Sequence, residues 1–375
     1  MYLEKIFSPS ELDILKSNAL ADVNINVELS DFKQNGFIIF GAGNLGHEVY
    51  TCIRSVLGLS PLYFVDNAKA GGSIDGIPIK GQDELYSAVN KYVILCSGKA
   101  LEMFNFCNKL GNIIPILPGA LRKFCFCPGE IGCHYSFFDK AEVYEAYTCL
   151  HEELSKNIFK DFILFHSTLI PNLANHYDKD SYFSLSLRSQ INYSHMVDAG
   201  AFTGDTLKVW LENVPENMQK TYYAFEPNKD NFLHLSRYVS TLNKDKQEKI
   251  FLYNKGLSDY PACRKMTLDN VLSRIDIDSK SGQDVELVTI DSIFEDKCVT
   301  VIKADVEGFE KSVLSGAKEQ IRKQRPSLIF SAYHYPQDIY SLILHINKIV
   351  EDYEYYLRLH LPYFGDVTLY AIPQN

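Results

Sequence analysis

The sequence lacks any long apolar segment. No run approaches the ~20 consecutive apolar residues that a helix needs to span a bilayer. A secretory signal peptide is also missing, because residues 1–30 alternate polar and apolar positions instead of presenting one apolar core. These absences exclude a membrane span and predict a cytoplasmic, soluble protein.

An excess of positive charge is missing as well. The 375 residues include 37 Lys and Arg against 47 Asp and Glu, which gives a net charge of -10 at pH 7, and no dense basic run occurs. Such a field would repel a phosphate-rich polymer. We therefore expect no nucleic-acid partner and favour a small-molecule or glycan acceptor, while a homo-oligomer is not excluded.

The nine cysteines lack the pattern of a disulfide framework. Their number is odd and they are scattered through a chain long enough to build its own core, which suits reduced thiols. One group was tested against zinc-site spacing; it comprises Cys125, Cys127, Cys133, His134, Cys149 and His151. The group lacks two paired knuckles, and adjacent Cys133 and His134 would strain to share one tetrahedral ion. Free buried thiols are the preferred interpretation, and no metal site is predicted here.

What the chain does contain is typical of a globular α/β protein. Hydrophobic residues make up 46% and charged residues 22%, and the length leaves room for two domains. Alternating strand and helix patterns occur twice, separated by apolar residues at helical spacing over 139–165. We predict two Rossmann-like domains, at 1–120 and 191–375, joined by a helical spacer at 121–190.

The first domain opens with a strand, a glycine-rich loop and a helix. The expected elements are a strand at Phe37–Phe40, a helix ending near Leu57, and strands at Leu62–Val65 and Tyr92–Cys96. Gly41, Gly43 and Gly46 form the spacing G-x-G-x-x-G, and Asp66 follows 20 residues beyond the last glycine. This is the pattern of a dinucleotide-binding loop.

Two interpretations of this first domain remain open. No acid precedes its glycine loop, so the loop favours phosphates, and a bound nucleotide or nucleotide-sugar is one expectation. The other is a Rossmann-like shell that presents substrate or supports assembly. Nicotinamide-linked redox chemistry is disfavoured, because no Ser/Tyr-x-x-x-Lys arrangement follows.

The second domain shows a longer alternation. Its expected strands are His195–Val197, Thr221–Phe225, Lys249–Tyr253, Val299–Lys303, Ser327–Ala332, Tyr355–Leu359 and Asp366–Ile372. Its expected helices are Asp205–Asn213, Lys229–Leu242, Glu310–Lys323 and Gln337–Ile349. No helix separates the last two strands, which should therefore pair antiparallel.

The candidate cofactor site is a second glycine turn, between the first strand and helix of this domain. Its expected cofactor-binding residues are Asp198, Gly200, Phe202, Gly204, Asp205 and Thr206. The glycines allow a ligand to approach the backbone closely. A carboxylate at the mouth of the turn would repel a pyrophosphate but tolerate the cationic, phosphate-free S-adenosylmethionine. The carboxylate of that cofactor could meet the helix N-terminus that follows.

A second cofactor contact is expected at Glu226, which closes the next strand 22 residues after Gly204. An acid at this position can accept hydrogen bonds from both ribose hydroxyls. The glycine turn and Glu226 are each a weak signal alone. Their order along the chain and their positions at strand ends together predict the cofactor site.

The candidate catalytic residues are Asp305, Glu307 and His334, which follow the fourth and fifth strands at the same sheet edge. Asp305 also lines the expected cofactor crevice. A carboxylate or an imidazole there can take the proton of an attacking hydroxyl. Helix capping is the alternative for Asp305 and Glu307, and divalent-metal binding is the alternative for the Asp305–His334 pair.

Two other histidines are weaker candidates. His360 follows another strand and is a less favoured base, whereas His195 precedes the first strand at the opposite edge and is expected to be structural.

The second domain resembles the FkbM-type methyltransferases, a branch of the S-adenosylmethionine-dependent class I fold. The resemblance rests on VDAGAFTGDT (197–206), AFEPN (224–228), VTIDSI (288–293), IKADVEGFEKSVLSGA (302–317), Tyr333-His334 and TLYAIP (368–373). It implies seven strands in the order 3-2-1-4-5-7-6 with the last antiparallel. It also implies O-methylation of glycans or other metabolites.

The first domain is similar to nucleotide-binding domains of polysaccharide-biosynthesis proteins, over about residues 36–119. Together the two resemblances predict an S-adenosylmethionine-dependent O-methyltransferase acting on a sugar or sugar-containing precursor. The alternatives are a nucleotide-sugar oxidoreductase or epimerase using the first domain, and a non-catalytic assembly protein of a glycan pathway.

Overall fold

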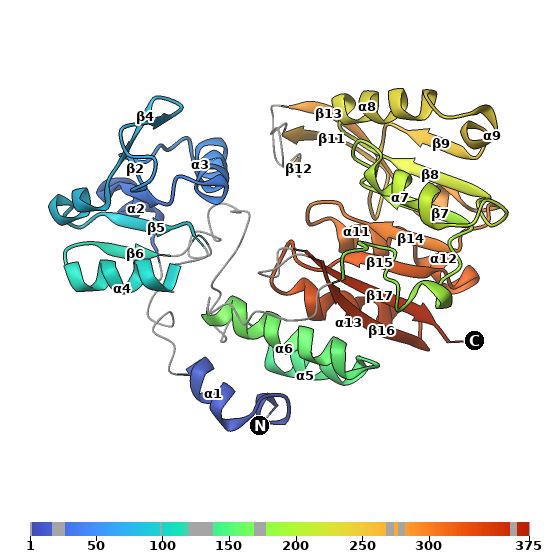
Figure 1. Ribbon diagram of the computed structural model, residues 1–375, viewed down its shortest axis with the longest axis horizontal. Helices are drawn as coiled ribbons and strands as arrows, with labels where there is room; N and C mark the ends of the chain where they lie inside the picture. Colours follow the sequence, from blue (N-terminus) through green and yellow to red (C-terminus); the bar gives the residue numbers. More distant parts are fainter. Residues whose placement is uncertain are drawn as a thin grey trace. The chain divides into compact units, whose positions relative to one another are not determined.

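A computed structural model describes residues 2–16, 27–97, 100–116, 118, 138–168, 178–267, 274–276, 282–360 and 366–374. The chain forms two compact units, and Figure 1 labels the helices and strands of each. Unit 1 comprises residues 1–144 and 159–174, and unit 2 comprises residues 145–158 and 175–375. No helix in the described part of the chain is both long and apolar enough to cross a bilayer.

Unit 1 is built on a mainly parallel sheet in the order β3-β4-β2-β1-β5-β6. Its strands are β1 (Phe37–Phe40), β2 (Phe64–Val65), β3 (Ser73–Ile74), β4 (Ile77–Lys80), β5 (Tyr92–Leu95) and β6 (Ile114–Ile116). Only β3 pairs antiparallel, with β4. The chain crosses back between β1 and β5, so the turns after these two strands meet at one sheet edge.

Helices cover both faces of this sheet. The described helical elements are η1 (Leu3–Lys5), α1 (Pro9–Lys16), α2 (Leu29–Asn35), α3 (Asn44–Leu57), η3 (Gln82–Ser87) and α4 (Ala100–Leu110). Successive residues of β1 point to opposite faces. Phe37 and Ile39 therefore pack with α2 and α3, while Ile38 and Phe40 pack with residues of α4. This accounts for the continuous apolar run that predicted a buried strand.

The segment predicted as a helical spacer contains α5 (Lys140–Cys149), α6 (Glu153–Thr168) and a single turn, η6 (Arg188–Gln190). Part of each long helix belongs to each unit. Within unit 2, the backbone N–H of His151 donates to the carbonyl of Tyr355, which ties the start of this segment to the sheet.

Unit 2 contains a seven-stranded sheet in the order β16-β17-β15-β14-β7-β8-β9. The strands are β7 (His195–Ala199), β8 (Thr221–Phe225), β9 (Ile250–Tyr253), β14 (Val301–Ala304), β15 (Ser327–Ser331), β16 (Tyr353–Leu359) and β17 (Val367–Pro373). Only β17 runs antiparallel, to both β15 and β16. This confirms the strand order 3-2-1-4-5-7-6 implied by the family resemblance.

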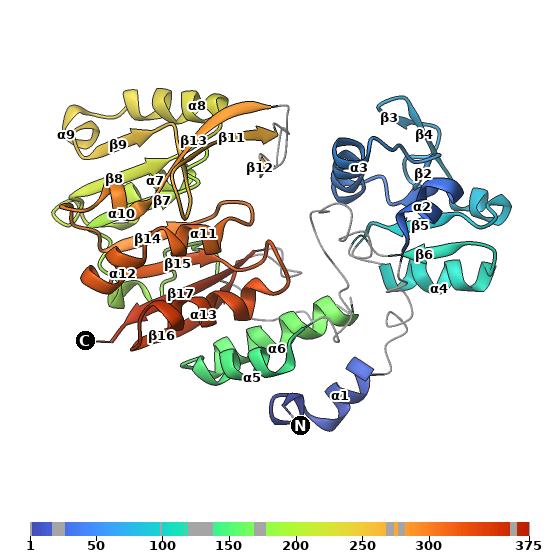
Figure 2. The same ribbon diagram turned by 180° about the vertical axis from the view of Figure 1, so that it is seen from behind.

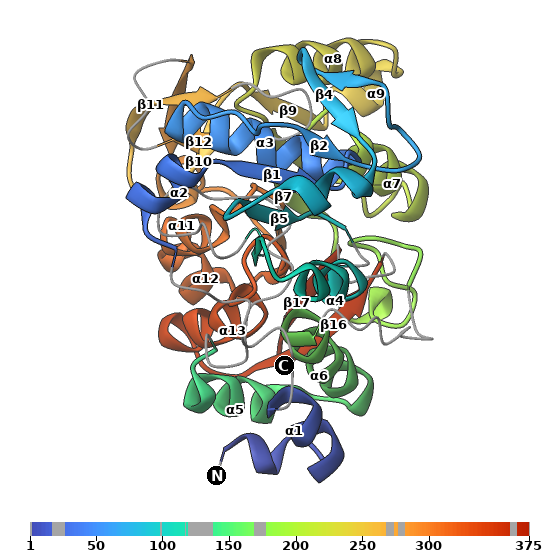
Figure 3. The ribbon, with the colours of Figure 1, turned by 90° about the vertical axis from the view of Figure 1, so that its left-hand side faces the viewer.

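Helices pack on both faces of the seven-stranded sheet. On one face, α7 (Asp205–Asn213) and α8 (Lys229–Ser240) share a core with alternate residues of the strands, including Met196 and Tyr222. Figure 2 shows α8 and the short α9 (Lys244–Gln247) near β9, at one edge of the sheet. Helix α13 (Asp338–Ile349) contacts both α11 (Glu310–Ser315) and α12 (Lys318–Gln324), and the three lie beside the sheet in Figure 3.

The single helix predicted over Glu310–Lys323 is wrong in one respect, because it is two helices. The break falls at Gly316, which ends α11. A Cβ atom at Gly316 would lie 1.9 Å from the carbonyl oxygen of Ser258. The backbone therefore approaches another segment too closely for a side chain, and the chain turns there before α12 begins.

A second, four-stranded sheet of unit 2 was not predicted. Its order is β10-β13-β11-β12, with β10 (Gly256–Leu257), β11 (Ala262–Thr267), β12 (Arg274–Asp276) and β13 (Gln283–Val288), and α10 (Ile290–Ile293) follows it. The buried core here is small, with Met266, Val285 and Leu287 as its members. Polar and charged residues occupy most other positions, so the apolar periodicity is too weak to reveal these strands.

Candidate active site

The candidate site lies at the carboxyl edge of the seven-stranded sheet, where the strand order reverses between β7 and β14. The two strands are parallel neighbours, with Asp198 opposite Lys303 and Ala199 opposite Ala304. The turns that follow both strands therefore start at the same level. Open α/β sheets bind ligands at such a reversal point.

Asp198 is at the end of β7 but does not face the mouth of the turn. It is fully buried, and its Oδ1 is 2.9 Å from the Nζ of Lys303, which is buried too. The hydroxyl of Tyr222 donates to the other carboxylate oxygen at 2.5 Å. The prediction that a free carboxylate guards this turn is therefore wrong, because Lys303 neutralises it inside the protein.

The lysine of this pair also holds the glycine turn. Burial alone would lower the pKa of Lys303, but the charges of Asp198 and Asp305 outweigh burial and raise it. Its Nζ donates to the carbonyl oxygen of Gly200 at 3.0 Å. The buried pair thus positions the backbone of the turn, a role that the sequence analysis did not recognise for either residue.

Gly200 and Gly204 are required mainly for packing within the protein. Both have positive φ angles, 79° and 95°. A Cβ atom at Gly200 would lie 1.9 Å from the carbonyl oxygen of Asp305, and one at Gly204 would lie 3.0 Å from Leu235 and Tyr238. The expectation that these glycines serve a ligand's approach is thus incomplete, since strand and helix packing already demand them.

The remaining turn residues occupy distinct environments. Phe202 has a φ of 46° and a side chain that is 48% exposed, which is unusual for a large aromatic residue. Asp205 is exposed and begins α7, and the next residue, Thr206, is buried. An exposed ring and an exposed helix N-terminus therefore lie within four residues of each other along the chain.

Glu226 follows β8 and lies next to the turn, as its position in the sequence predicted. Its side chain accepts hydrogen bonds from the backbone N–H of Phe202, at 2.9 Å, and of Asn228, at 2.8 Å. Only 5% of the residue is exposed, and no ion pair with a described residue balances its charge. Burial raises the pKa of Glu226 to about 7, although the two N–H groups oppose this shift.

Asp305 directly follows β14, on the other side of the turn. One of its oxygens, Oδ2, accepts a hydrogen bond from the hydroxyl of Tyr182 at 2.8 Å. Burial acts to raise the pKa of Asp305, but Lys303 and His334 outweigh it and lower the pKa. Tyr182 was missed by the sequence analysis, because it precedes Asp305 by 123 residues and no local pattern connects the two.

His334 follows β15 and is surrounded by carboxylates. Its Nδ1 is 2.9 Å from Glu310, and its Nε2 is 3.4 Å from Asp305 and 3.5 Å from Glu307. Burial alone would lower its pKa, but Glu310, Asp305 and Glu307 together raise it to about 10. The surrounding carboxylates therefore favour the protonated ring, and the role of His334 as a general base stays a prediction.

The capping alternative for Asp305 and Glu307 is also wrong. Helix α11 begins at Glu310 with Phe309 as its N-cap, and no side chain caps it. Glu307 has a φ of 53°, the left-handed region that non-glycine residues rarely adopt, and its side chain is 31% exposed. Such strain is retained where neighbouring structure imposes it, as at functional sites.

The same edge also carries a histidine and an acid from the last two strands. His360 is buried, and its Nδ1 is 2.8 Å from the carbonyl oxygen of Asp178. Burial raises the pKa of Asp366 to about 6, although His360 opposes the shift. Asp366 was missed by the sequence analysis, and its place at the start of an antiparallel strand is the signal that could have identified it. His195 lies at the opposite edge, where its Nδ1 is 2.8 Å from Thr221.

The glycine loop of unit 1 is arranged similarly. The N–H of Ala42 donates to Asp66 at 3.2 Å, and the Nζ of Lys69 donates to the carbonyl of Ala42 at 2.6 Å. A Cβ atom at Gly41 would lie 2.2 Å from the carbonyl oxygen of Cys96, and one at Gly46 would lie 1.8 Å from that of Gly41 itself. Gly43 precedes α3 as its N-cap, with open space around it.

Only part of the cysteine-rich group lies within the described residues. Cys125, Cys127, Cys133 and His134 lie outside the described residues. Cys149 accepts a hydrogen bond from the side chain of Asn347 at 3.4 Å, and His151 is 3.5 Å from Glu354.

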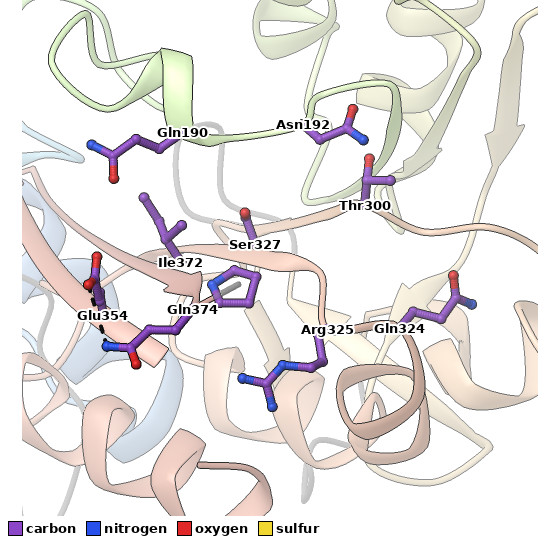
Figure 4. A pocket seen from close by; sticks show the side chains of 10 residues that line it. Gln190, Asn192, Thr300, Gln324, Arg325, Ser327, Glu354, Ile372 and Gln374 are labelled. Atoms are coloured by element: carbon purple, nitrogen blue, oxygen red, sulfur yellow. Dashed lines mark hydrogen bonds between the residues drawn. The ribbon is translucent and has the colours of Figure 1, made fainter. Parts of the chain in front are cut away.

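A hollow of about 720 Å³ lies at the amino edge of the seven-stranded sheet, away from the acids described above. Its lining is mainly polar and includes Asn192, Thr300, Ser327 and Arg325. The apolar Ile372 also lines it (Figure 4). Thr300 is occupied in structural bonding, since its hydroxyl accepts from the N–H of His195. The hollow therefore holds none of the predicted site residues.

A protein-family model matches the part of the chain that contains the candidate site. Residues 198–357 fit the family model described as a methyltransferase FkbM domain. This part of the chain is therefore similar in sequence to FkbM-type methyltransferase domains. The whole chain is also similar in structure to methyltransferase FkbM from Methylobacillus flagellatus KT, with a TM-score of 0.65 and 22% identity, over 96% of this chain and 98% of that one.

Other solved structures are similar to a smaller share of this chain. Aeropyrum pernix fibrillarin, solved with S-adenosyl-L-methionine, aligns with a TM-score of 0.31 and 10% identity, over 48% of this chain and 67% of that one. An rRNA methylase from Streptococcus thermophilus aligns with a TM-score of 0.31 and 13% identity, over 49% and 90%. No curated protein sequence matches the chain.

Proposed function

We propose that unit 2 is an S-adenosylmethionine-dependent O-methyltransferase. The observation that carries this proposal is the placement of Glu226 and Asp305 on the two sides of the glycine turn at Gly200. Glu226 is held by the turn itself, and Asp305 contacts its backbone closely. A cofactor residue and an acceptor residue are thus positioned by one rigid element.

The residues present suit the cofactor. Glu226 is a buried acid without an ion-pair partner among the described residues, and each carboxylate oxygen accepts one N–H and retains further acceptor capacity. This leaves it able to accept hydrogen bonds from two ribose hydroxyls. Phe202 offers an exposed ring, Asp205 and Thr206 lie at the start of α7, and Asp198 acts indirectly by positioning Gly200 through Lys303.

Bound S-adenosylmethionine supplies a methyl group made electrophilic by its sulfonium. The chain must then orient an acceptor hydroxyl and draw away its proton. Asp305 is ionised and fixed by Tyr182, and Glu307 beside it is partly exposed. We assign the orientation of the hydroxyl to Asp305, with His334 as a positioning residue beside it.

The acceptor that we propose is a hydroxyl of a sugar, a glycan precursor or a related metabolite. The net charge of -10 disfavours phosphate-rich polymers, and the exposed ring of Phe202 could pack against a sugar face.

The test is calorimetric titration of the protein with S-adenosylmethionine. We expect saturable binding by the wild type, and a loss of at least tenfold in affinity for Glu226→Ala. Asp305→Asn should bind the cofactor within about twofold of the wild type and lose turnover with a sugar acceptor by about 100-fold, the contribution typical of a positioned proton acceptor. Wild-type protein that gives no heat and no thermal shift would refute the proposal.

For unit 1 we propose a nucleotide or nucleotide-sugar as ligand. The open N-cap of α3 at Gly43 and the amine of Lys69 next to Ala42 support an anionic ligand at this loop. Titration with a panel of nucleoside diphosphates and nucleotide-sugars tests it, with Gly43→Asp as the variant expected to abolish binding. If no member of the panel binds the wild type, unit 1 has a role other than nucleotide binding.

A further inference from the structure

We propose that His360 is the base that takes the proton of the acceptor hydroxyl. This residue directly follows β16, at the carboxyl edge of the seven-stranded sheet, and it is only 5% exposed. The proposal rests on the proposed function and deepens it. Asp305 is assigned the orientation of the hydroxyl, and the group that receives the proton is the part of the reaction still to be assigned.

The first support is the hydrogen bond that fixes the ring of His360. Its Nδ1 is 2.8 Å from the carbonyl oxygen of Asp178, and a carbonyl oxygen can only accept. Nδ1 therefore carries a hydrogen, and the neutral ring keeps its lone pair on Nε2. The backbone N–H of Asp178 in turn donates to the carbonyl oxygen of Leu359 at 2.8 Å. Two hydrogen bonds thus hold the ring against the end of β16.

The second support is that Nε2 of His360 is available. This atom is buried and makes no hydrogen bond with a described residue, and the ring forms no ion pair with a described carboxylate. His334 differs, because a carboxylate lies within 3.5 Å of each of its ring nitrogens. A buried acceptor atom without a protein partner is rare and points to a ligand or a bound water as its partner. Of these two histidines, it is therefore His360 that has a nitrogen able to receive a proton.

The third support is an acid on the same face of the sheet. Leu359 pairs with Val367 in the ladder of β16 and β17, so His360 stands opposite Asp366, and its backbone N–H donates to the carbonyl oxygen of Asp366 at 2.9 Å. Opposite residues of an antiparallel pair have their side chains on one face. Burial raises the pKa of Asp366 to about 6, although His360 opposes the shift, so the carboxylate is ionised at neutral pH. Its charge stabilises the positive ring that forms when His360 takes a proton.

Tyr182 connects this pair to Asp305. The ring centroids of Tyr182 and His360 are 6.5 Å apart, and the hydroxyl of Tyr182 donates to Oδ2 of Asp305 at 2.8 Å. Asp305 is also close enough to Asp366 to raise its pKa. The base and the residue that orients the hydroxyl therefore belong to one group of neighbouring side chains. A base can receive a proton directly or through one bridging water, which suits a nitrogen as buried as Nε2.

In the proposed step, the hydroxyl proton passes to Nε2 of His360 as the acceptor oxygen attacks. A C–O bond forms with the methyl group of S-adenosylmethionine, the C–S bond breaks, and its electron pair returns to sulfur. The imidazolium keeps its bond to the carbonyl of Asp178 and faces the charge of Asp366. It then releases the proton to water, which restores the neutral ring.

The first experiment is nitrogen-15 NMR of the full-length protein labelled at histidine, without S-adenosylmethionine and at about pH 8.5, so that neutral rings are observed. The resonances that disappear in His360→Asn identify the ring. We expect them to show a hydrogen on Nδ1 and none on Nε2. A hydrogen on Nε2 would overturn the proposal. Because no cofactor is added, that result is independent of whether S-adenosylmethionine binds through Glu226.

The second experiment measures turnover of His360→Asn. The amide nitrogen of asparagine can take the place of Nδ1 and donate to Asp178, but this side chain has no counterpart of Nε2. We expect S-adenosylmethionine to bind within about twofold of the wild type, and methylation of a panel of methyl hexopyranosides to slow by about 100-fold. His345→Gln is the matched control, because it alters a half-buried histidine of α13 that is hydrogen-bonded to Ser315, and it should keep wild-type turnover.

Thermal unfolding checks that each variant is folded, and His360→Gln is the second variant if His360→Asn unfolds. Turnover near the wild-type rate in a folded His360 variant would overturn the role of this residue and leave the proposed function intact. A wild type that binds no S-adenosylmethionine would refute the proposed function, and with it the catalytic step, whatever hydrogen positions the NMR spectrum shows.

Discussion

At the scale of single residues, burial determines what each acid of the site can do. Asp198 lies near the end of β7, and Glu226 and Asp305 directly follow β8 and β14, but each acid meets a different partner. Lys303 neutralises Asp198, backbone N–H groups hold Glu226, and Tyr182 and His334 contact Asp305. Three carboxylates with similar positions in the sequence therefore have three different roles.

The buried pair of Asp198 and Lys303 leads to a prediction on stability. Lys303→Met removes one partner and leaves the carboxylate of Asp198 buried without its cation. We expect a loss of about 3–5 kcal/mol in the free energy of unfolding of unit 2. Urea unfolding followed by tryptophan fluorescence measures it, because the only tryptophan, Trp210, lies in the core of this unit.

The matched control is Lys255→Met, which removes a more exposed lysine paired with Glu286. It should cost less than about 1 kcal/mol. Equal effects of the two substitutions would show that the buried pair does not stabilise the site as we infer.

Glu226 leads to a prediction on pH. Its pKa of about 7 means that its carboxylate form, which accepts hydrogen bonds from hydroxyls, gains population as the pH rises through 7. The affinity for S-adenosylmethionine should therefore increase by about tenfold between pH 6 and pH 8. Calorimetry at both values measures it. Glu226→Gln should bind weakly with little dependence on pH, and a wild-type affinity that falls over this range would contradict the assignment.

At the scale of elements, the close contact between the turn after β7 and the end of β14 sets the shape of the site. Gly200 provides this contact, because its missing Cβ leaves room for the carbonyl of Asp305. The strands on either side are fully buried and cannot shift to accommodate a methyl group. The contact therefore fixes the turn after β7 against the end of β14.

Gly200→Ala tests this link. The added Cβ, 1.9 Å from the carbonyl oxygen of Asp305, should push the turn away and weaken S-adenosylmethionine binding by more than tenfold. Gly58→Ala is the control, because Gly58 has a similar φ of 66° but open space around it. Calorimetry should show wild-type affinity for the control. Equal affinities of the two variants for S-adenosylmethionine would show that Gly200 does not shape the site.

At the scale of the whole molecule, the two units repeat one arrangement. In each, a glycine after the first strand packs against the carbonyl of the residue that follows the neighbouring strand: Gly41 against Cys96, and Gly200 against Asp305. In each, the acid after the second strand accepts an N–H of the turn. Unit 2 adds a buried ion pair, Asp198 with Lys303, beneath its turn.

We expect the two turns to act independently in cofactor binding. Asp66→Ala removes the acid that accepts the N–H of Ala42 in unit 1, and should leave the affinity for S-adenosylmethionine within about twofold of the wild type. Titration calorimetry compares it with Glu226→Ala. A tenfold loss in Asp66→Ala would show that both turns contribute to one cofactor site.

Much of the framework could be predicted from local sequence. The apolar run of β1, the mainly apolar β7 and β14, and the glycine turns after β1 and β7 are strong local signals, since buried parallel strands are rich in apolar residues. The four-stranded sheet could not be predicted, because its short, largely polar strands show little hydrophobic periodicity. The charge states of Asp198 and Asp305 could not be predicted either, because their partners Lys303 and Tyr182 come from other strands and loops.

The sequence by itself determined the order of the strands in the seven-stranded sheet, the acids at the ends of these strands, and the similarity of residues 198–357 to the FkbM methyltransferase model, because these depend on local pattern. Only the tertiary structure decided that Asp198 is neutralised, that Glu226 is not, and that His334 is surrounded by carboxylates. The reason is physical: pKa and hydrogen bonding depend on which distant groups burial brings together, and no local pattern encodes those distances.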